Sequence, residues 1–200
     1  LARQYTADGW TVYGGARDPD NADELRALGG AVFELNVTDH DQIKAAAHAL
    51  KHQPIDLLIN NAATFAPDGP RTLMLPDMDE FTRVMRVNAV APIYVADAFE
   101  AHVAESTRRQ MVFIGTRSGS IGDNTSGGHY AYRCSKAALN MAVKSLSIDF
   151  AANGVTTVVL HPGSVATETR KGGQIPVTES VSGMRNVIDG LTTDMSGSFL

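Results

Sequence analysis

The sequence has little of three things that would point to particular classes of protein. It has one cysteine in 200 residues, which excludes an internal disulfide and favours a reducing compartment such as the cytoplasm. It has no uninterrupted apolar run near the roughly 18 residues that a membrane-spanning helix needs. It has no excess of positive charge, because 17 Lys and Arg face 22 Asp and Glu for a net charge of -5. Neither nucleic acid nor an anionic membrane is therefore an expected partner.

What the sequence does have is a regular alternation of short β-branched runs with longer helical patterns, in a chain that is 44% hydrophobic. Strands are expected at residues 10–16, 31–35, 55–60, 111–115 and 155–160, and helices at residues 20–28, 39–51, 79–105, 131–152 and 180–191. Apolar strands separated by helices are typical of a parallel sheet that is covered on both faces. The pattern predicts a doubly wound, Rossmann-type α/β fold, in a single dinucleotide-binding domain over residues 1–200.

The strongest chemical signal is Tyr132 and Lys136, which are four residues apart in an expected helix. Residues at i and i+4 share one helix face, so the phenol and the ammonium lie side by side. A phenol has a reference pKa of about 10, and a neighbouring cation favours its deprotonated form. The pair therefore predicts an acid/base device for a carbonyl or an alcohol. The spacing alone is weak evidence, so the surrounding motifs must decide.

Those motifs occur in a definite order along the chain. They are Asn60-Asn61-Ala62-Ala63 after the third expected strand, Asn88 in the next helix, the Tyr132 and Lys136 pair, and Pro162 to Thr167 after the last strand. In this order and spacing they make the whole chain resemble the classical short-chain dehydrogenase/reductase family. Residues 119–121, 124–128 and 130–133 are similar to its carbonyl-reductase branch, which includes sniffer and the C-factor signalling proteins.

The resemblance implies a role for each catalytic position. Tyr132 would give a proton to a carbonyl oxygen during reduction, or remove one from an alcohol during oxidation. Lys136 would lower the pKa of the phenol and hydrogen-bond the nicotinamide ribose, and Asn88 would hold a water that links Lys136 to solvent. A hydroxyl after the strand at 111–115 would orient the substrate oxygen. The number of residues after the strand favours Thr116 as this hydroxyl. The usual interval before Tyr132 points nearer to Ser118, so both residues remain candidates.

The resemblance also implies a nicotinamide cofactor and no metal. The cofactor would contact Asn60, Asn61 and Ala62 on its adenosine side, Pro162, Gly163, Val165 and Thr167 on its nicotinamide side, and Tyr132 and Lys136. Arg17 follows the first expected strand, where an arginine accommodates the 2′-phosphate of NADP, so NADP is preferred and NAD stays possible. Asn36 stands where the family usually has Asp beside the adenine, and its side-chain carbonyl could accept from the adenine amino group. Val37, next to it, is also expected to contact the cofactor.

Both ends of the chain depart from the family pattern. The family opens with a strand and a glycine-rich turn that receives the pyrophosphate, and no such turn precedes the strand at 10–16. Residues 1–8 resemble the second half of the helix that should follow that turn. We therefore expect roughly 20–30 further residues, about one βα unit, before Leu1. Ser198-Phe199-Leu200 is interpreted as the start of a final strand.

The expected function is an NAD(P)-dependent oxidoreductase of carbonyl-reductase type, acting on a small-molecule carbonyl or alcohol. A cytoplasmic homodimer through the helices at 79–105 and 131–152 is expected, mainly from the resemblance. The rival hypothesis is a cofactor-binding signalling or sensor protein with little turnover, which would use the same residues. A cofactor-free structural relative is a third hypothesis, which gains weight only if the native chain begins at Leu1. The sequence does not identify the substrate.

Overall fold

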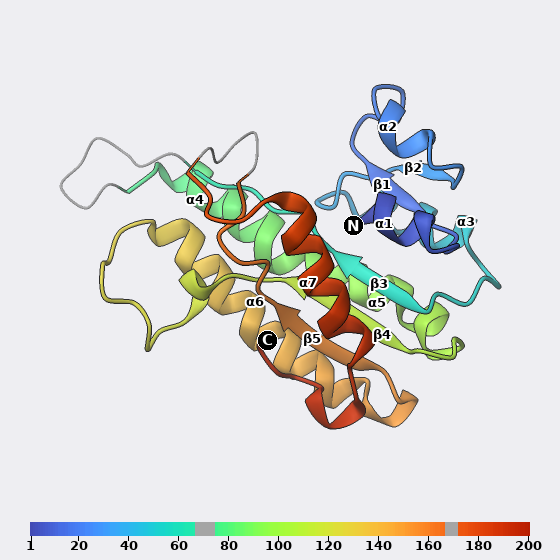
Figure 1. The fold of residues 1–200 in the computed structure, drawn as a ribbon. Coiled ribbons are helices and arrows are strands. Elements are labelled where there is room, and N and C mark those ends of the chain that lie inside the picture. Colours follow the sequence, from blue (N-terminus) through green and yellow to red (C-terminus); the bar gives the residue numbers. More distant parts are fainter. Residues whose placement is uncertain (67–74, 167–171) are drawn as a thin grey trace. The chain divides into compact units, whose positions relative to one another are not determined.

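The computed structural model describes residues 1–66, 75–166 and 172–200 (Figure 1). The contacts divide the chain into two compact units, Leu1–Lys51 and His52–Leu200. None of the described helices combines the length and the apolar character that crossing a membrane requires.

The first unit is a small α/β element with one pair of parallel strands. Its elements are α1 (Ala2–Ala7), β1 (Gly14–Ala16), α2 (Asp23–Arg26), β2 (Val32–Glu34) and α3 (His40–Ala49). Gly14 pairs with Val32 and Ala16 with Glu34, so β1 extends only as far as its partner and is shorter than the expected strand at 10–16. Asp39 begins α3, because its carboxylate accepts hydrogen bonds from the free backbone N–H groups of Asp41 and Gln42.

The second unit is built on a parallel sheet in the order β3 (Leu57–Asn60), β4 (Gln110–Ile114), β5 (Thr156–Leu160). The C-terminal residues extend it beyond β5, since Val159 donates to the Ser198 carbonyl and Leu200 donates to the Val159 carbonyl, each at 2.9 Å. Phe199 pairs with Val159 in an isolated parallel bridge, so the structure has the first pairing of the strand expected at the C-terminus but no full strand there. Every residue of β5 is buried, as expected of a strand that is covered on both faces.

Helices cover both faces of this second sheet. Figure 1 shows α7 (Val177–Asp189) on one face, and α5 (Ala91–Ala104) and α6 (Tyr130–Asp149) on the other. Val103 of α5 and Val143 of α6 form one buried cluster with Phe113 of β4 and Val159 of β5. The helices thus bury the sheet, and the loops at the carboxyl ends of β3, β4 and β5 are left to form a site.

The helix expected over residues 79–105 is not continuous. It consists of α4 (Met78–Met85), a π-helical segment at Arg86–Val90, and α5, and the Ala91 N–H donates to the Arg86 carbonyl five residues back. Pro92 has no N–H, so it can donate neither to the carbonyl of Asn88 in an α-helical bond nor to that of Val87 in a π-helical bond. The expectation of one regular helix was therefore wrong at Asn88, and π segments of this kind often mark functional sites.

Candidate functional site

Tyr132 and Lys136 lie one turn apart at the start of α6, as the sequence predicted. The Lys136 ammonium is 6.0 Å from the centroid of the Tyr132 ring. Its side chain is only 2% exposed, and its Nζ donates to the carbonyl oxygen of Ile114 at 2.9 Å. Since Ile114 ends β4, one buried hydrogen bond fixes the amine between the helix and the end of the sheet.

Burial lowers the pKa of Lys136 from its usual 10.5 to about 8. The physical cause is the loss of water around the charged amine, which disfavours the protonated form. No carboxylate hydrogen-bonds or ion-pairs with this amine among the residues that the structure describes. An amine with such a pKa can gain and lose a proton near neutral pH, which suits a group that passes protons to a neighbouring phenol.

The ring of Tyr132 is held from the side by an aromatic residue that the sequence analysis missed. Phe65, in the loop after β3, packs against it with ring centroids 5.1 Å apart at an angle of 56°. Phe65 also contacts His129, the residue before α6, at 5.4 Å. The only sequence signal was an aromatic residue five positions after the Asn60 motif begins. Its partner could not be known before the loop was placed.

Asn88 joins the loop after β3 to α6. Its side chain is fully buried, accepts from the Thr64 N–H and donates to the Thr64 carbonyl, both at 2.8 Å, and donates to Ser135 Oγ at 3.0 Å. Ser135 in turn donates to the Tyr132 carbonyl at 2.8 Å. Because both amide hydrogens are used, the Asn88 amide could hold a water that links Lys136 to solvent only as an acceptor. The backbone carbonyl of Asn88, which has no α-helical donor at Pro92, is another possible acceptor, and this role stays a prediction.

Both hydroxyl candidates, Thr116 and Ser118, lie in the loop after β4. Thr116 Oγ1 accepts from the Ser118 N–H at 3.2 Å and begins a short turn of 3-10 helix (Arg117–Gly119). A Cβ at Gly119 would lie 2.8 Å from the backbone of Lys136, so this loop packs directly on the helix turn that carries the lysine. The loop that carries both hydroxyls therefore packs next to Lys136. Either Thr116 or Ser118 stays a candidate for orienting the substrate oxygen.

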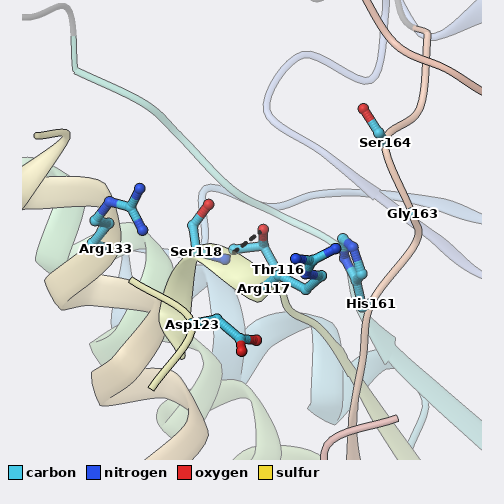
Figure 2. A pocket seen from close by; sticks show the side chains of 8 residues that line it. All are labelled: Thr116, Arg117, Ser118, Asp123, Arg133, His161, Gly163 and Ser164. Atoms are coloured by element: carbon cyan, nitrogen blue, oxygen red, sulfur yellow. Dashed lines mark hydrogen bonds between the residues drawn. The ribbon is translucent and has the colours of Figure 1, made fainter. Parts of the chain in front are cut away.

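These hydroxyls open into a cavity with a volume of about 250 Å³. Its lining residues are Thr116, Arg117, Ser118, Asp123, Arg133, His161, Gly163 and Ser164 (Figure 2). Tyr132 and Lys136 are not among the lining residues, and the two predicted hydroxyl positions, Thr116 and Ser118, connect the cavity to the predicted site. Arg117, Arg133 and His161 were missed from the sequence, although each directly neighbours a motif residue.

The segment after β5 forms another wall of the same cavity. The Pro162 carbonyl accepts from Ser180 Oγ of α7 at 2.6 Å, which ties the strand end to the helix. Gly163 has a φ of +80°, and a Cβ there would meet the Ile175 side chain at 2.6 Å, so only glycine fits. Val165 pairs with Ile175 in an isolated bridge. Thr167, the last residue of this predicted motif, lies outside the described residues.

The predicted adenosine-side residues Asn60, Asn61 and Ala62 follow β3. Asn61 and Ala62 are exposed, whereas Asn60 is half-buried. The Asn60 Nδ2 is buried and has no hydrogen-bond partner among the described residues. A buried donor without an acceptor costs about 1–3 kcal/mol. A bound group that offers an oxygen or nitrogen acceptor would remove this cost, so Asn60 suits a ligand site.

The remaining predicted cofactor residues lie in the first unit. Arg17 directly follows β1 and is exposed, and its neighbour Asp18 accepts from Asn21 Nδ2 at 2.6 Å. That hydrogen bond, with the Asn21 N–H, holds the pKa of the Asp18 carboxyl below its usual value. The acid next to Arg17 is thus engaged locally, and Arg17 makes no ion pair with any residue in the described ranges.

Asn36 makes local hydrogen bonds at the position that the sequence matched to the adenine. Its Oδ1 accepts from both the N–H and the Oγ1 of Thr38, at 3.1 and 2.9 Å. An adenine amino group would compete with Thr38 for this oxygen, and the contact with adenine stays a prediction. Val37, next to it, is half-buried in the same loop.

Comparisons with known proteins agree with this geometry. Residues 1–176 match the family model described as short chain dehydrogenase. The chain is 42% identical over 151 residues to the C-signal protein of Myxococcus xanthus, over 73% of this chain and 87% of that protein. Its fold is similar to that of an NADPH-bound carbonyl reductase from chicken fatty liver (TM-score 0.85, 32% identity, 94% of this chain and 84% of that chain).

It is also similar to the carbonyl reductase Sniffer of D. melanogaster, with a TM-score of 0.88 and 26% identity over 100% of this chain and 90% of that chain. These similarities confirm the expected doubly wound α/β fold and the expected branch of relatives.

Proposed function

Because this chain belongs to the short-chain dehydrogenase family, we propose that it is an NADP(H)-dependent oxidoreductase that interconverts a carbonyl compound and its alcohol. The observation that carries this proposal is the buried Lys136 amine, held by the Ile114 carbonyl one helix turn from Tyr132. That arrangement places an amine with a lowered pKa beside a phenol, next to a loop that carries two hydroxyls. It is the arrangement that proton transfer to a substrate oxygen requires.

Each unit by itself has a group that suits a phosphorylated dinucleotide. In the second unit, the Asn60 Nδ2 at the end of β3 is a donor without a partner among the described residues. In the first unit, Arg17 after β1 is a guanidinium that forms no ion pair within the described ranges. The solved relative from chicken holds NADPH, which supports the same cofactor here. When bound, the nicotinamide supplies the hydride that reduces the carbonyl carbon.

The residues of the chain supply the proton and the orientation. The hydroxyl of Thr116 or Ser118 donates a hydrogen bond to the carbonyl oxygen and orients it. Tyr132 transfers its phenolic proton to that oxygen as the carbon is reduced, and the alcohol leaves. The Lys136 ammonium stabilises the phenolate and can return a proton to it, because its pKa of about 8 lies close to the pH of the reaction.

A second candidate function is a cofactor-binding signalling protein, favoured by the 42% identity to the C-signal protein. The two functions are separated by measuring NADPH binding by fluorescence and NADPH oxidation with a panel of neutral and anionic ketones, aldehydes and quinones. We expect both binding and turnover. Binding without turnover on any compound would favour the signalling function, and absence of both would contradict the two proposals together.

We expect Arg17 to select the phosphorylated cofactor. Replacing Arg17 with Ser should raise the KM for NADPH about 10- to 100-fold, the effect of losing a hydrogen-bonded charge, and leave the KM for NADH nearly unchanged. The matched control is Asp18→Asn, which should change either KM by less than about twofold because Asn21 already engages that carboxylate. Weaker NADH binding in Asp18→Asn, with no effect in Arg17→Ser, would instead make NAD the cofactor.

We also propose that the protein is a homodimer through the segment 78–104 and α6. Large apolar side chains are exposed on both, including Ile93 and Tyr94 on α5 and Met141 and Ile148 on α6, with exposed fractions between 39% and 69%. Apolar side chains clustered on a surface are typical of interaction sites. The cytoplasmic location stays a prediction.

A further inference from the structure

The cavity beside Thr116 and Ser118 is lined by two arginines that the proposed reaction does not use. Arg117 directly follows Thr116, and Arg133 directly follows Tyr132, so each catalytic position has an arginine next to it in the chain. His161 is the third nitrogen-bearing side chain in the wall. In the view of Figure 2, Arg133 lies on one side of Ser118 and Thr116, and Arg117 lies on the other side, toward His161.

Arg133 has a hydrogen-bond donor for which the described residues supply no acceptor. Its Nη2 donates to Ser126 Oγ at 2.9 Å, but its Nε is buried and has no hydrogen-bond partner among the described residues. A buried guanidinium donor without an acceptor is costly, and its fork geometry matches a carboxylate or a phosphate. Arg133 therefore has an unused donor on the wall of a cavity next to the reacting groups.

The charge of the cavity also favours an anion. The lining contains two guanidinium groups and one carboxylate, that of Asp123. Its net charge is therefore positive even with His161 neutral. Asp123 forms an ion pair with neither arginine in the part of the chain that the structure describes. In Figure 2 its carboxylate lies well away from the Ser118 hydroxyl. The arginines are thus not neutralised from within the cavity.

We propose that the substrate carries an oxyanion group, a carboxylate or a phosphate, that binds Arg133, while Arg117 adds positive charge to the same cavity. Its carbonyl would lie at Tyr132 and the Thr116 or Ser118 hydroxyl. This inference rests on the proposed oxidoreductase function, because it names the substrate class of that site. The anion takes no part in the chemistry, since hydride and proton go to the carbonyl carbon and oxygen. Its binding energy positions the carbonyl for reaction.

The test compares pairs of substrates that differ in one anionic group, with the protein saturated with NADPH. Levulinate and its methyl ester test the carboxylate, and dihydroxyacetone phosphate and dihydroxyacetone test the phosphate. We expect the anionic member of at least one pair to have a kcat/KM about 10- to 100-fold higher. Arg133→Gln should remove that preference and Arg117→Gln should weaken it, each leaving the neutral member unchanged, whereas Arg133→Lys should keep part of the preference because the charge remains.

Two further variants make the comparison sharper. Asp123→Asn removes the one carboxylate of the lining and should lower the KM of the anionic member, a change in the opposite direction to the arginine variants. Arg3→Gln is the control for loss of a positive charge elsewhere, because Arg3 pairs with Glu24 on the surface. It should leave both members of each pair unchanged.

The outcomes separate this inference from the proposed function. If both members of each pair turn over equally and the arginine variants change neither, the anion site is contradicted and the oxidoreductase stands. If the arginine variants raise the KM for NADPH instead, these arginines bind the cofactor and the inference is overturned. If no compound turns over, calorimetric binding of levulinate or inorganic phosphate that is lost in Arg133→Gln would still support the anion site, and its absence would overturn it.

Discussion

Replacing Tyr132 with Phe is expected to lower kcat about 100- to 10,000-fold, the usual contribution of a general acid. The variant loses one oxygen and keeps the ring, so the packing against Phe65 at 5.1 Å should persist. The Lys136 hydrogen bond to Ile114 does not involve the phenol and should also persist. The dissociation constant for NADPH, measured by fluorescence titration, should therefore change by less than about threefold.

The matched control is Tyr130→Phe, two residues earlier at the start of the same helix. Tyr130 is 38% exposed, and the proposed mechanism gives it no role. Its loss of one hydroxyl should leave kcat unchanged within about twofold. If Tyr132→Phe retained near-normal turnover on a compound that the native protein reduces, Tyr132 could not be the acid, and the proposed mechanism would be wrong.

Replacing Lys136 with Met should abolish turnover and also make the protein without cofactor more stable near neutral pH. The native lysine has a pKa of about 8 in the folded protein against 10.5 when exposed, so below about pH 8 the folded protein bears the cost of a buried charge. That cost is about 3 kcal/mol. Between pH 8 and 10.5 the unfolded chain binds a proton that the folded protein does not, so native stability rises with pH through this window.

The measurement is urea unfolding of both proteins, without cofactor, at about pH 7 and about pH 10. The stability advantage of Lys136→Met should be largest at the lower pH and shrink at the higher one. Lys144→Met, an exposed lysine on the same helix, is the control and should show no such dependence. An advantage that grew with pH would show that burial does not lower the pKa of Lys136.

The order of the motifs made the acid/base pair predictable, because Tyr132 and Lys136 need only local helical geometry to meet. The pairing of the C-terminal residues with β5 was also expected, from the interpretation of Ser198 to Leu200 as the start of a strand. The hydrogen bond from Lys136 to Ile114 was not predictable, because it joins residues 22 positions apart. Nor was the contact of Phe65 with Tyr132, which depends on where a loop folds back.

Two local features show why the rest of the site resisted prediction. Pro92 signals a missing hydrogen bond in the sequence, but whether the helix kinks, ends or forms a π segment depends on the contacts of Asn88 with Thr64 and Ser135. Asn36 was matched by position to an adenine contact, and the sequence did not reveal that its oxygen accepts from Thr38 two residues later.

By itself the sequence determined the α/β architecture and the proximity of Tyr132 to Lys136, because these follow from hydrophobic periodicity and from a short spacing along a helix. The family came from the resemblance that the ordered motifs carry. The tertiary structure alone decided that burial lowers the pKa of Lys136, that Asn88 holds the loop after β3 to α6, and that Arg117 and Arg133 share a cavity. The physical reason is that burial, charge and hydrogen-bond competition depend on groups brought together from distant parts of the chain, which no local pattern encodes.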